Sequence, residues 1–149
     1  MGRSRVIKPE TIRVEISDGD YIVVRKELNN GQQKKLENCG LMPPMIVDGR
    51  VVQPVDWERH DLERALVFLT GWSLADDNGE LMPIDISSLR AIDPSTFEEI
   101  NHAVVTHIME IAAAKKAARD AKKAAQSEPT TNAPSPTGTE DAAAPTSQS

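Results

Sequence analysis

The chain of 149 residues contains a single cysteine, Cys39, and no long hydrophobic run. One cysteine cannot form an intramolecular disulfide, so the fold cannot depend on one. Because no run approaches the roughly 20 apolar residues that span a bilayer, we expect no membrane segment. The first ten residues, MGRSRVIKPE, lack the apolar core of a signal peptide, so we expect no leader. These features predict a protein of a reducing cytoplasm.

Motifs for catalysis and metal binding are also missing. The sequence has no glycine-rich phosphate loop and no nucleophile elbow. His102 and His107 are five residues apart, so on a helix they point to different sides, whereas chelation from one face needs a spacing of four. The acidic stretch ADDNGE at 75–80 resembles a calcium loop, but alignment on Gly79 puts Leu74 at the first ligand position. We interpret this stretch as a hairpin turn, since Asn-Gly accepts positive φ. From the whole sequence we expect no enzymatic activity, no bound metal and no cofactor.

The formal net charge of −6 is spread unevenly. Residues 1–55 hold nine Lys/Arg against seven Asp/Glu (+2), residues 56–99 three against eleven (−8), and residues 112–125 five against one (+4). The acidic middle argues against a nucleic-acid groove, which needs a basic face opposite the phosphates. The basic segment has no interleaved aromatic residues to stack on bases. We therefore expect no nucleic-acid partner.

A β-hairpin is the first element that the sequence predicts. Residues 11–16 (TIRVEI) alternate polar and apolar side chains, which would bury Ile12, Val14 and Ile16 on one face. The turn signal SDGD follows at 17–20, and the β-rich run YIVVRK follows at 21–26. The pattern indicates an antiparallel hairpin over about 11–26.

The next segment, up to residue 55, carries weaker signals. A short polar helix from about Gly31, closed by Gly40, is compatible with residues 27–40, and Cys39 reads as a small buried hydrophobe. A small hairpin about Asp48-Gly49 could pair residues 45–47 with 50–52. Three prolines confine those strands to an edge, or else make the segment an ordered loop.

Residues 56–74 (DWERHDLERALVFLTGWSL) fit two structures. As a helix, Asp56 would cap it and Gly71 would end it; as a strand, alternate residues up to Leu74 share one face. We predict a helical turn around 56–63 and a strand from about Ala65 to Leu74. The acidic turn would join it to a partner strand at 81–86, held at an edge by Pro83. This gives a second hairpin over about 65–86.

A long helix over about 94–125 has the clearest signal. Asp93 before Pro94 is a capping pair, and residues 95–98 (STFE) fit a capping box in a second frame. Apolar residues then recur at helical spacing and form one stripe. The stripe consists of Phe97, Ile100, Val104, Ile108 and Ile111. From residue 112 on, alanine and lysine maintain helix propensity with nothing large to bury, so we expect an exposed helical extension that ends near Gln126.

The sequence therefore predicts an α+β fold with a small antiparallel sheet packed against one long helix. We divide the chain into a flexible N-terminal arm (1–10), a core domain (11–111), a helical extension (112–126) and a disordered tail (127–149). The tail is rich in Pro, Ser, Thr and Ala and cannot repay its ordering entropy by burial.

An ordered series of short segments resembles one protein family. The series runs GWSL at 71–74, DDNG at 76–79, LMPI at 81–84, LRAI at 89–92, DPSTFEEI at 93–100, and then a helix with His107, preceded upstream by DYIVVRKEL at 20–28. It resembles the tail assembly chaperones of long-tailed (siphovirus-type) bacteriophages. The likeness covers residues 11–111, and the Ala/Lys helix with its low-complexity tail also fits.

The resemblance implies a non-enzymatic protein of the host cytoplasm. Such chaperones bind the tape measure protein, keep it soluble and help recruit tail tube subunits; many also exist as a longer frameshifted form. The alternative class is a structural virion protein, a tail tube or head–tail connector subunit.

Two surfaces are candidates for partner binding, the apolar stripe with a tryptophan and the basic segment. The alternatives are that the stripe is entirely core and that the basic segment is a solvated helix end. The candidate residues are Trp72, Phe97, Ile100, Val104, Ile108, Ile111, Lys115, Lys116, Arg119, Lys122 and Lys123.

Overall fold

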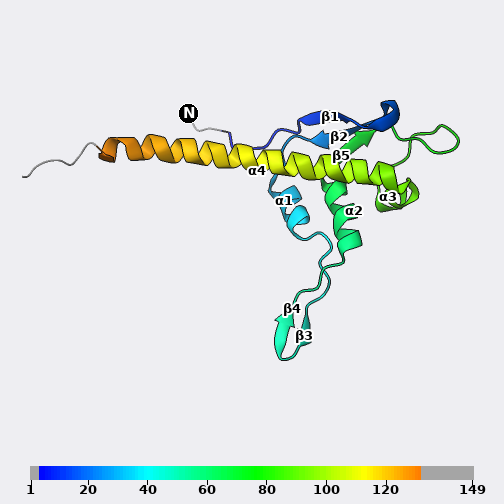
Figure 1. The fold of residues 1–149 in the computed structure, drawn as a ribbon, viewed down its shortest axis with the longest axis horizontal. Helices are drawn as coiled ribbons and strands as arrows, with labels where there is room; N and C mark the ends of the chain where they lie inside the picture. Colours follow the sequence, from blue (N-terminus) through cyan, green and yellow to red (C-terminus); the bar gives the residue numbers. More distant parts are fainter. Residues whose placement is uncertain (1–3, 132–149) are drawn as a thin grey trace, which may run out of the picture. The chain divides into compact units, whose positions relative to one another are not determined.

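A computed structural model describes the backbone of residues 4–131 and the side chains of residues 4–126. The chain divides into two compact units, Met1–Ile108 and Met109–Ser149. The first unit contains two small sheets, three helices and the first turns of the long helix α4 (Pro94–Thr131), as Figure 1 shows. The α+β class with a long C-terminal helix is confirmed. Residues 4–10 have no regular structure and are exposed.

The main sheet is antiparallel and has the order β1-β2-β5. Strands β1 (Thr11–Glu15) and β2 (Tyr21–Arg25) form the predicted hairpin, with Ile12 opposite Val24. The central strand β2 buries Ile22 and Val24 completely, whereas Ile12 on the outer strand is exposed. The prediction that the first strand carries the buried face is therefore wrong for Ile12, because β1 lies at the sheet edge.

The second predicted hairpin, over 65–86, is wrong. Helix α2 (Trp57–Phe68) continues through most of the expected strand, and only β5 (Leu69–Trp72) is extended. The helix prevails because it buries Leu62, Ala65 and Phe68 on one face. Strand β5 pairs with β2, and residues 81–86 contribute only an isolated bridge between Ala75 and Leu81 before the short helix α3 (Ile86–Ala91).

The weaker predictions for residues 27–55 are confirmed. Helix α1 (Asn30–Glu37) begins with a capping box, since Asn29 accepts from the Gln32 amide and the Gln32 side chain accepts from the Asn29 amide. Strands β3 (Met45–Val47) and β4 (Arg50–Val52) form a hairpin with positive φ at Asp48 and Gly49.

Gly40 follows α1 with φ +70°. A Cβ at this position would lie 2.6 Å from the Asp56 carbonyl oxygen, so only glycine lets the chain pass so close to the start of α2.

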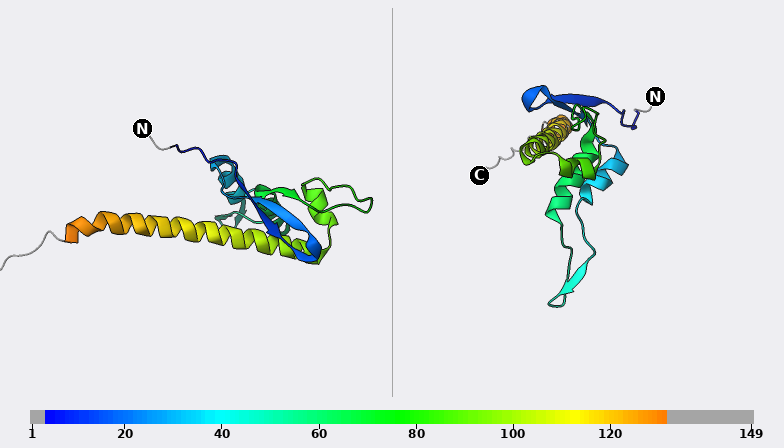
Figure 2. Two further views of the ribbon diagram at one scale, coloured as in Figure 1. Left: turned by 90° about the horizontal axis from the view of Figure 1, so that it is seen from above. Right: turned by 90° about the vertical axis from the view of Figure 1, so that its right-hand side faces the viewer.

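The core of the first unit is formed where α2, α4 and the sheet meet. Its completely buried side chains are Phe68, Ile22, Ile100, Val24 and Val104. Two hydrogen bonds of 2.8 Å connect α4 to the sheet hairpin: the Ser17 amide donates to Glu99, and His107 Nε2 donates to the Arg25 carbonyl. Figure 2 shows β1 and β2 (blue) beside the first turns of α4. The predicted packing of the long helix on the sheet is confirmed for the part within the first unit.

Helix α4 begins in the frame set by Asp93 and Pro94. The Asp93 carboxylate accepts from the Thr96 amide at 2.9 Å and from the hydroxyls of Ser95 and Thr96 at 2.6 and 2.7 Å. The alternative frame, a capping box from Ser95 to Glu98, is not used. The helix extends to Thr131, past the predicted end near Gln126, and the remainder of the predicted disordered tail lies outside the described residues.

Truncation of Ile100 should destabilise the first unit. Ile100 is completely buried, so Ile100→Ala removes apolar contacts and leaves a cavity, and we expect a loss of about 2–5 kcal/mol in the free energy of unfolding. Chemical denaturation followed by circular dichroism measures it. Met109→Ala on the same helix is exposed and should change stability by less than about 0.5 kcal/mol. Equal effects of the two variants would contradict the placement of Ile100 in the core.

The cap at Asp93 should make stability depend on acid pH. Hydrogen bonds from Ser95 and Thr96 lower the pKa of the Asp93 carboxyl in the folded state. The contribution is therefore complete above the unfolded-state pKa of about 3.9 and is lost as the pH falls below it towards the folded-state pKa. The comparison is with Asp93→Asn, which keeps a cap but cannot ionise. Urea unfolding should show a difference in the free energy of unfolding between wild type and this variant at pH 7, and a smaller difference at pH 3. A pH-independent difference would contradict this.

Candidate functional site

Part of the predicted apolar stripe belongs to the core. Ile100 and Val104 are completely buried, and Trp72 is buried with its indole N–H donating to the Met82 carbonyl at 2.8 Å. These three residues are therefore not on a surface that a partner could reach, which corrects their assignment as partner-binding residues. Phe97, Ile108 and Ile111 are half-buried.

The predicted basic segment is helical and exposed. It lies in the second unit, and all its cationic side chains are exposed. They are Lys115, Lys116, Arg119, Lys122 and Lys123. Asp120 is the only acidic residue among residues 112–125, so this part of α4 presents a basic surface.

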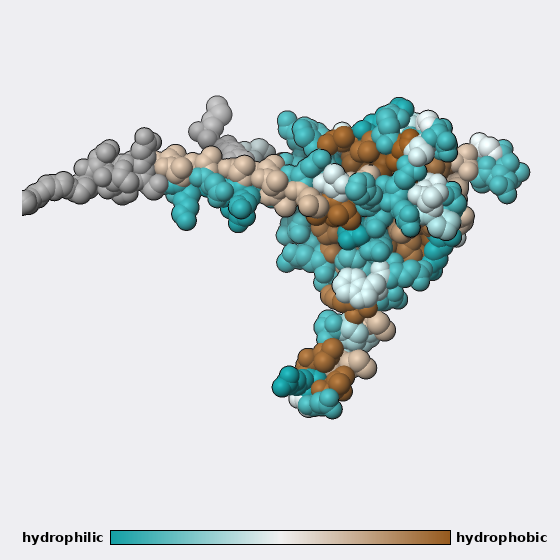
Figure 3. Space-filling view, in the orientation of Figure 1, coloured by the Kyte–Doolittle hydropathy of each residue, from teal (hydrophilic) through white to brown (hydrophobic). Residues whose placement is uncertain are grey.

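The hairpin of β3 and β4 is an exposed apolar surface that the sequence reasoning did not select. All five of its large apolar side chains are exposed; they are Met45, Ile46, Val47, Val51 and Val52. Ile46 and Val51, directly opposite each other, are 76% and 77% exposed. Figure 3 shows brown apolar atoms gathered at this hairpin. Apolar surface of this kind, gathered in one place, marks sites of protein interaction.

The hairpin register separates its two faces. Met45 pairs with Val52 and Val47 pairs with Arg50 on one face, while Ile46 and Val51 form the other face. The two legs of the base are joined to each other, because the Met42 amide donates to the Pro54 carbonyl and the Gln53 side chain donates to the Met42 carbonyl. The amide of Asp56, the N-cap of α2, donates to the Gly40 carbonyl and so fixes the base at the start of this helix. We name residues 45–52 the apolar hairpin.

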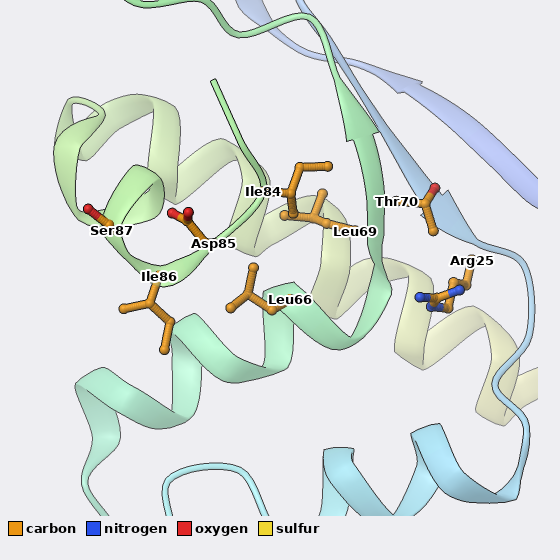
Figure 4. A pocket seen from close by; sticks show the side chains of 8 residues that line it. All are labelled: Arg25, Leu66, Leu69, Thr70, Ile84, Asp85, Ile86 and Ser87. Carbon is orange, nitrogen blue, oxygen red and sulfur yellow. The ribbon is translucent and has the colours of Figure 1, made fainter. Parts of the chain in front are cut away.

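An open groove lies at the other end of α2, along the edge strand β5. Its volume is about 810 Å³, and its apolar lining comes from Leu66, Leu69, Ile84 and Ile86. Arg25 and Asp85 lie at its two sides, as Figure 4 shows, together with Thr70 and Ser87. Arg25 Nε donates to the Val67 carbonyl at 3.0 Å, and Asp85 caps α3 through the Ser88 amide at 2.8 Å. We name this surface the β5 groove.

Three titratable residues of types often found in catalytic or metal sites have structural roles in this fold. His107 is buried, donates to the Arg25 carbonyl and meets the Phe68 ring edge-on, with ring centroids 5.6 Å apart. Cys39 is buried, its thiol donates to the Lys35 carbonyl at 3.2 Å, and burial raises its pKa. The confirmed turn at 76–80 binds its own backbone, since Asp76 accepts from the Asn78 and Glu80 amides.

The described residues show neither a metal site nor a membrane-spanning helix. Within residues 4–131, no group of three or more His, Cys, Asp or Glu side chains could hold a metal ion. In the same residues, no helix combines the length and the apolar character needed to cross a membrane.

A signal for the apolar hairpin was present in the sequence. The segments MIV at 45–47 and RVV at 50–52 are apolar at nearly every position, so both faces of the hairpin carry apolar side chains. The prolines at 43, 44 and 54 confine these strands to a sheet edge or make the segment a loop. Two apolar faces on strands with at most one neighbour are a signal for exposed apolar surface.

Comparison with protein-family models, with curated proteins and with solved structures found no match to this chain.

Proposed function

We propose that this chain is a non-enzymatic tail assembly chaperone of a long-tailed bacteriophage. In this role it binds the tape measure protein in the host cytoplasm and helps recruit tail tube subunits around it. The family resemblance of residues 11–111 supplies the identity of the partners, and a longer frameshifted form of the chain would be a third partner.

One observation carries the proposal: the first unit exposes an apolar hairpin. Five large apolar side chains in eight residues are exposed to water. Hydration of this apolar surface is unfavourable in free energy, and a protein partner that covers it would remove that contribution. A tape measure protein before assembly exposes long apolar helical stripes, and the bare face of Ile46 and Val51 is the kind of surface that covers them.

The basic segment of α4 supports the same role. Its five exposed cations would attract acidic stretches of a helical partner and accelerate encounter, and the effect would weaken with salt. Apolar contact by the hairpin and attraction by the basic segment are separable, because the two lie in different units of the chain.

Substitution in the apolar hairpin should weaken tape measure binding. Val51→Glu puts a charge on the bare face, and we expect recovery of the tape measure protein with the tagged chain to fall at least about tenfold. Val6→Glu is the matched control, since Val6 is an exposed valine (80%) outside the hairpin. Equal recovery with both variants would show that the hairpin is not the binding surface.

Removal of residues 112–149 should weaken the same complex in a salt-dependent way. Without the cations of α4, recovery of the tape measure protein should fall at low salt and differ little from wild type at high salt. If the truncated chain recovers as much partner as the full chain at low salt, the basic segment has no part in docking.

Mass spectrometry of purified particles separates the chaperone from the structural class. A chaperone should be missing from finished particles, whereas abundant copies of this chain would identify a tail tube or head–tail connector subunit and overturn the proposal.

A further inference from the structure

The first unit carries two apolar surfaces, the apolar hairpin and the β5 groove. We propose that the apolar hairpin of one copy of this chain inserts into the β5 groove of a second copy. This self-association goes beyond the proposed function and does not depend on the identity of the tape measure protein.

The hairpin gains from such a partner because two strands alone are marginally stable in water. Strands β3 and β4 form a separate two-stranded sheet, and Ile46 and Val51 leave its bare face to solvent. Both outer edges of a two-stranded sheet also carry unpaired backbone groups, which favour the addition of strands. Contact with a third strand and an apolar wall would satisfy both needs.

The β5 groove offers that strand and that wall. The sheet order β1-β2-β5 leaves β5 at an edge, and Leu69 and Thr70 of this strand line the groove. Leu66, Ile84 and Ile86 complete its apolar lining, against which the Ile46 and Val51 side chains would pack. An extended segment laid along β5 would join the sheet in the manner of β-augmentation.

Both surfaces carry charges of both signs. The hairpin has one anion and one cation at its tip, Asp48 and Arg50. The groove has one cation and one anion at its two sides, Arg25 and Asp85. The groove therefore favours a partner that carries both signs, as the hairpin does, over an apolar partner of a single charge sign, which one side of the groove would repel.

The hairpin cannot fill the groove of its own chain. Its base is held at the start of α2 by the Leu41–Val55 bridge, and Leu66 and Leu69 lie at the other end of this helix. Twelve helical residues separate the two ends by about 18 Å, and Figure 1 shows the hairpin extending away from β5. The hairpin and groove must then join different molecules, either reciprocally in a closed dimer or head to tail in a longer chain.

Sedimentation of the full-length chain alone tests the proposal. We expect wild type to form dimers or larger species, while Val51→Glu in the hairpin and Ile84→Glu in the groove each sediment as monomers. The matched controls, Val6→Glu and Leu81→Glu, change exposed apolar residues (80% and 67%) outside both surfaces and should sediment as wild type. Circular dichroism of every variant confirms that the helices remain folded.

Mixing the two monomeric variants gives the decisive result. A Val51→Glu copy keeps an intact groove and an Ile84→Glu copy keeps an intact hairpin, so an equal mixture should form heterodimers through one interface. A wild-type monomer at up to roughly 1 mM, the weak end of measurable association, would overturn the proposal. A mixture that stays monomeric would also overturn it, because the intact hairpin of one variant would then not bind the intact groove of the other. An Ile84→Glu variant that dimerises alone would show that hairpins pair with each other and would overturn it as well.

The two proposals can fail separately. Ile84→Glu should abolish self-association and leave recovery of the tape measure protein intact, since the hairpin of that variant is unchanged. A chain that self-associates through hairpin and groove but recovers no tape measure protein would overturn the proposed function alone.

Discussion

The contact between Phe68 and His107 is the interaction on which the first unit depends. Phe68 is the last residue of α2, and its buried ring meets the edge of the His107 ring on α4. His107 in turn donates to the carbonyl of Arg25, the last residue of β2. One aromatic contact and one hydrogen bond therefore join α2, α4 and the main sheet.

This core determines which apolar residues remain for partners. Ile100 and Val104 are completely buried, so the long helix contributes these apolar positions to the fold. The segment between α1 and α2 has no such cover. Its base is fixed by backbone hydrogen bonds near Gly40 and Asp56, and the strands beyond that base reach away from the core. Apolar side chains on those strands thus stay exposed, and they supply the surface on which both proposals rest.

A surface of this kind has a physical consequence for an assembly protein. Exposed β-rich apolar segments tend to pair with any available strand edge, and soluble proteins usually blunt them. Prolines flank the apolar hairpin and limit its growth at the base, but its tip and bare face stay open. Storage of the hairpin in the groove of another copy would protect it until a stronger apolar partner competes. The apolar hairpin would then bind either the groove of another copy or the partner protein, so self-association and chaperone action would use the same surface.

Local features of the sequence determined much of this protein. The first hairpin follows from alternation and a turn signal, the start of α4 from Asp93 and Pro94, and the small hairpin from Asp48-Gly49, because each signal acts over a few neighbouring residues. Only the tertiary structure decided whether residues 64–68 are helix or strand. The helical and the strand spacing both place apolar residues on one face, so the local sequence does not choose between them. The choice depends on burial in the core that α2 shares with α4 and β2. It also decided that β5 pairs with β2 rather than with residues 81–86. It decided, too, that Ile100 and Val104 of the α4 stripe are core while the hairpin is exposed. Burial is a property of the whole fold, so the sequence carries a signal for the apolar hairpin, but only the placement of distant segments determines that its side chains stay exposed.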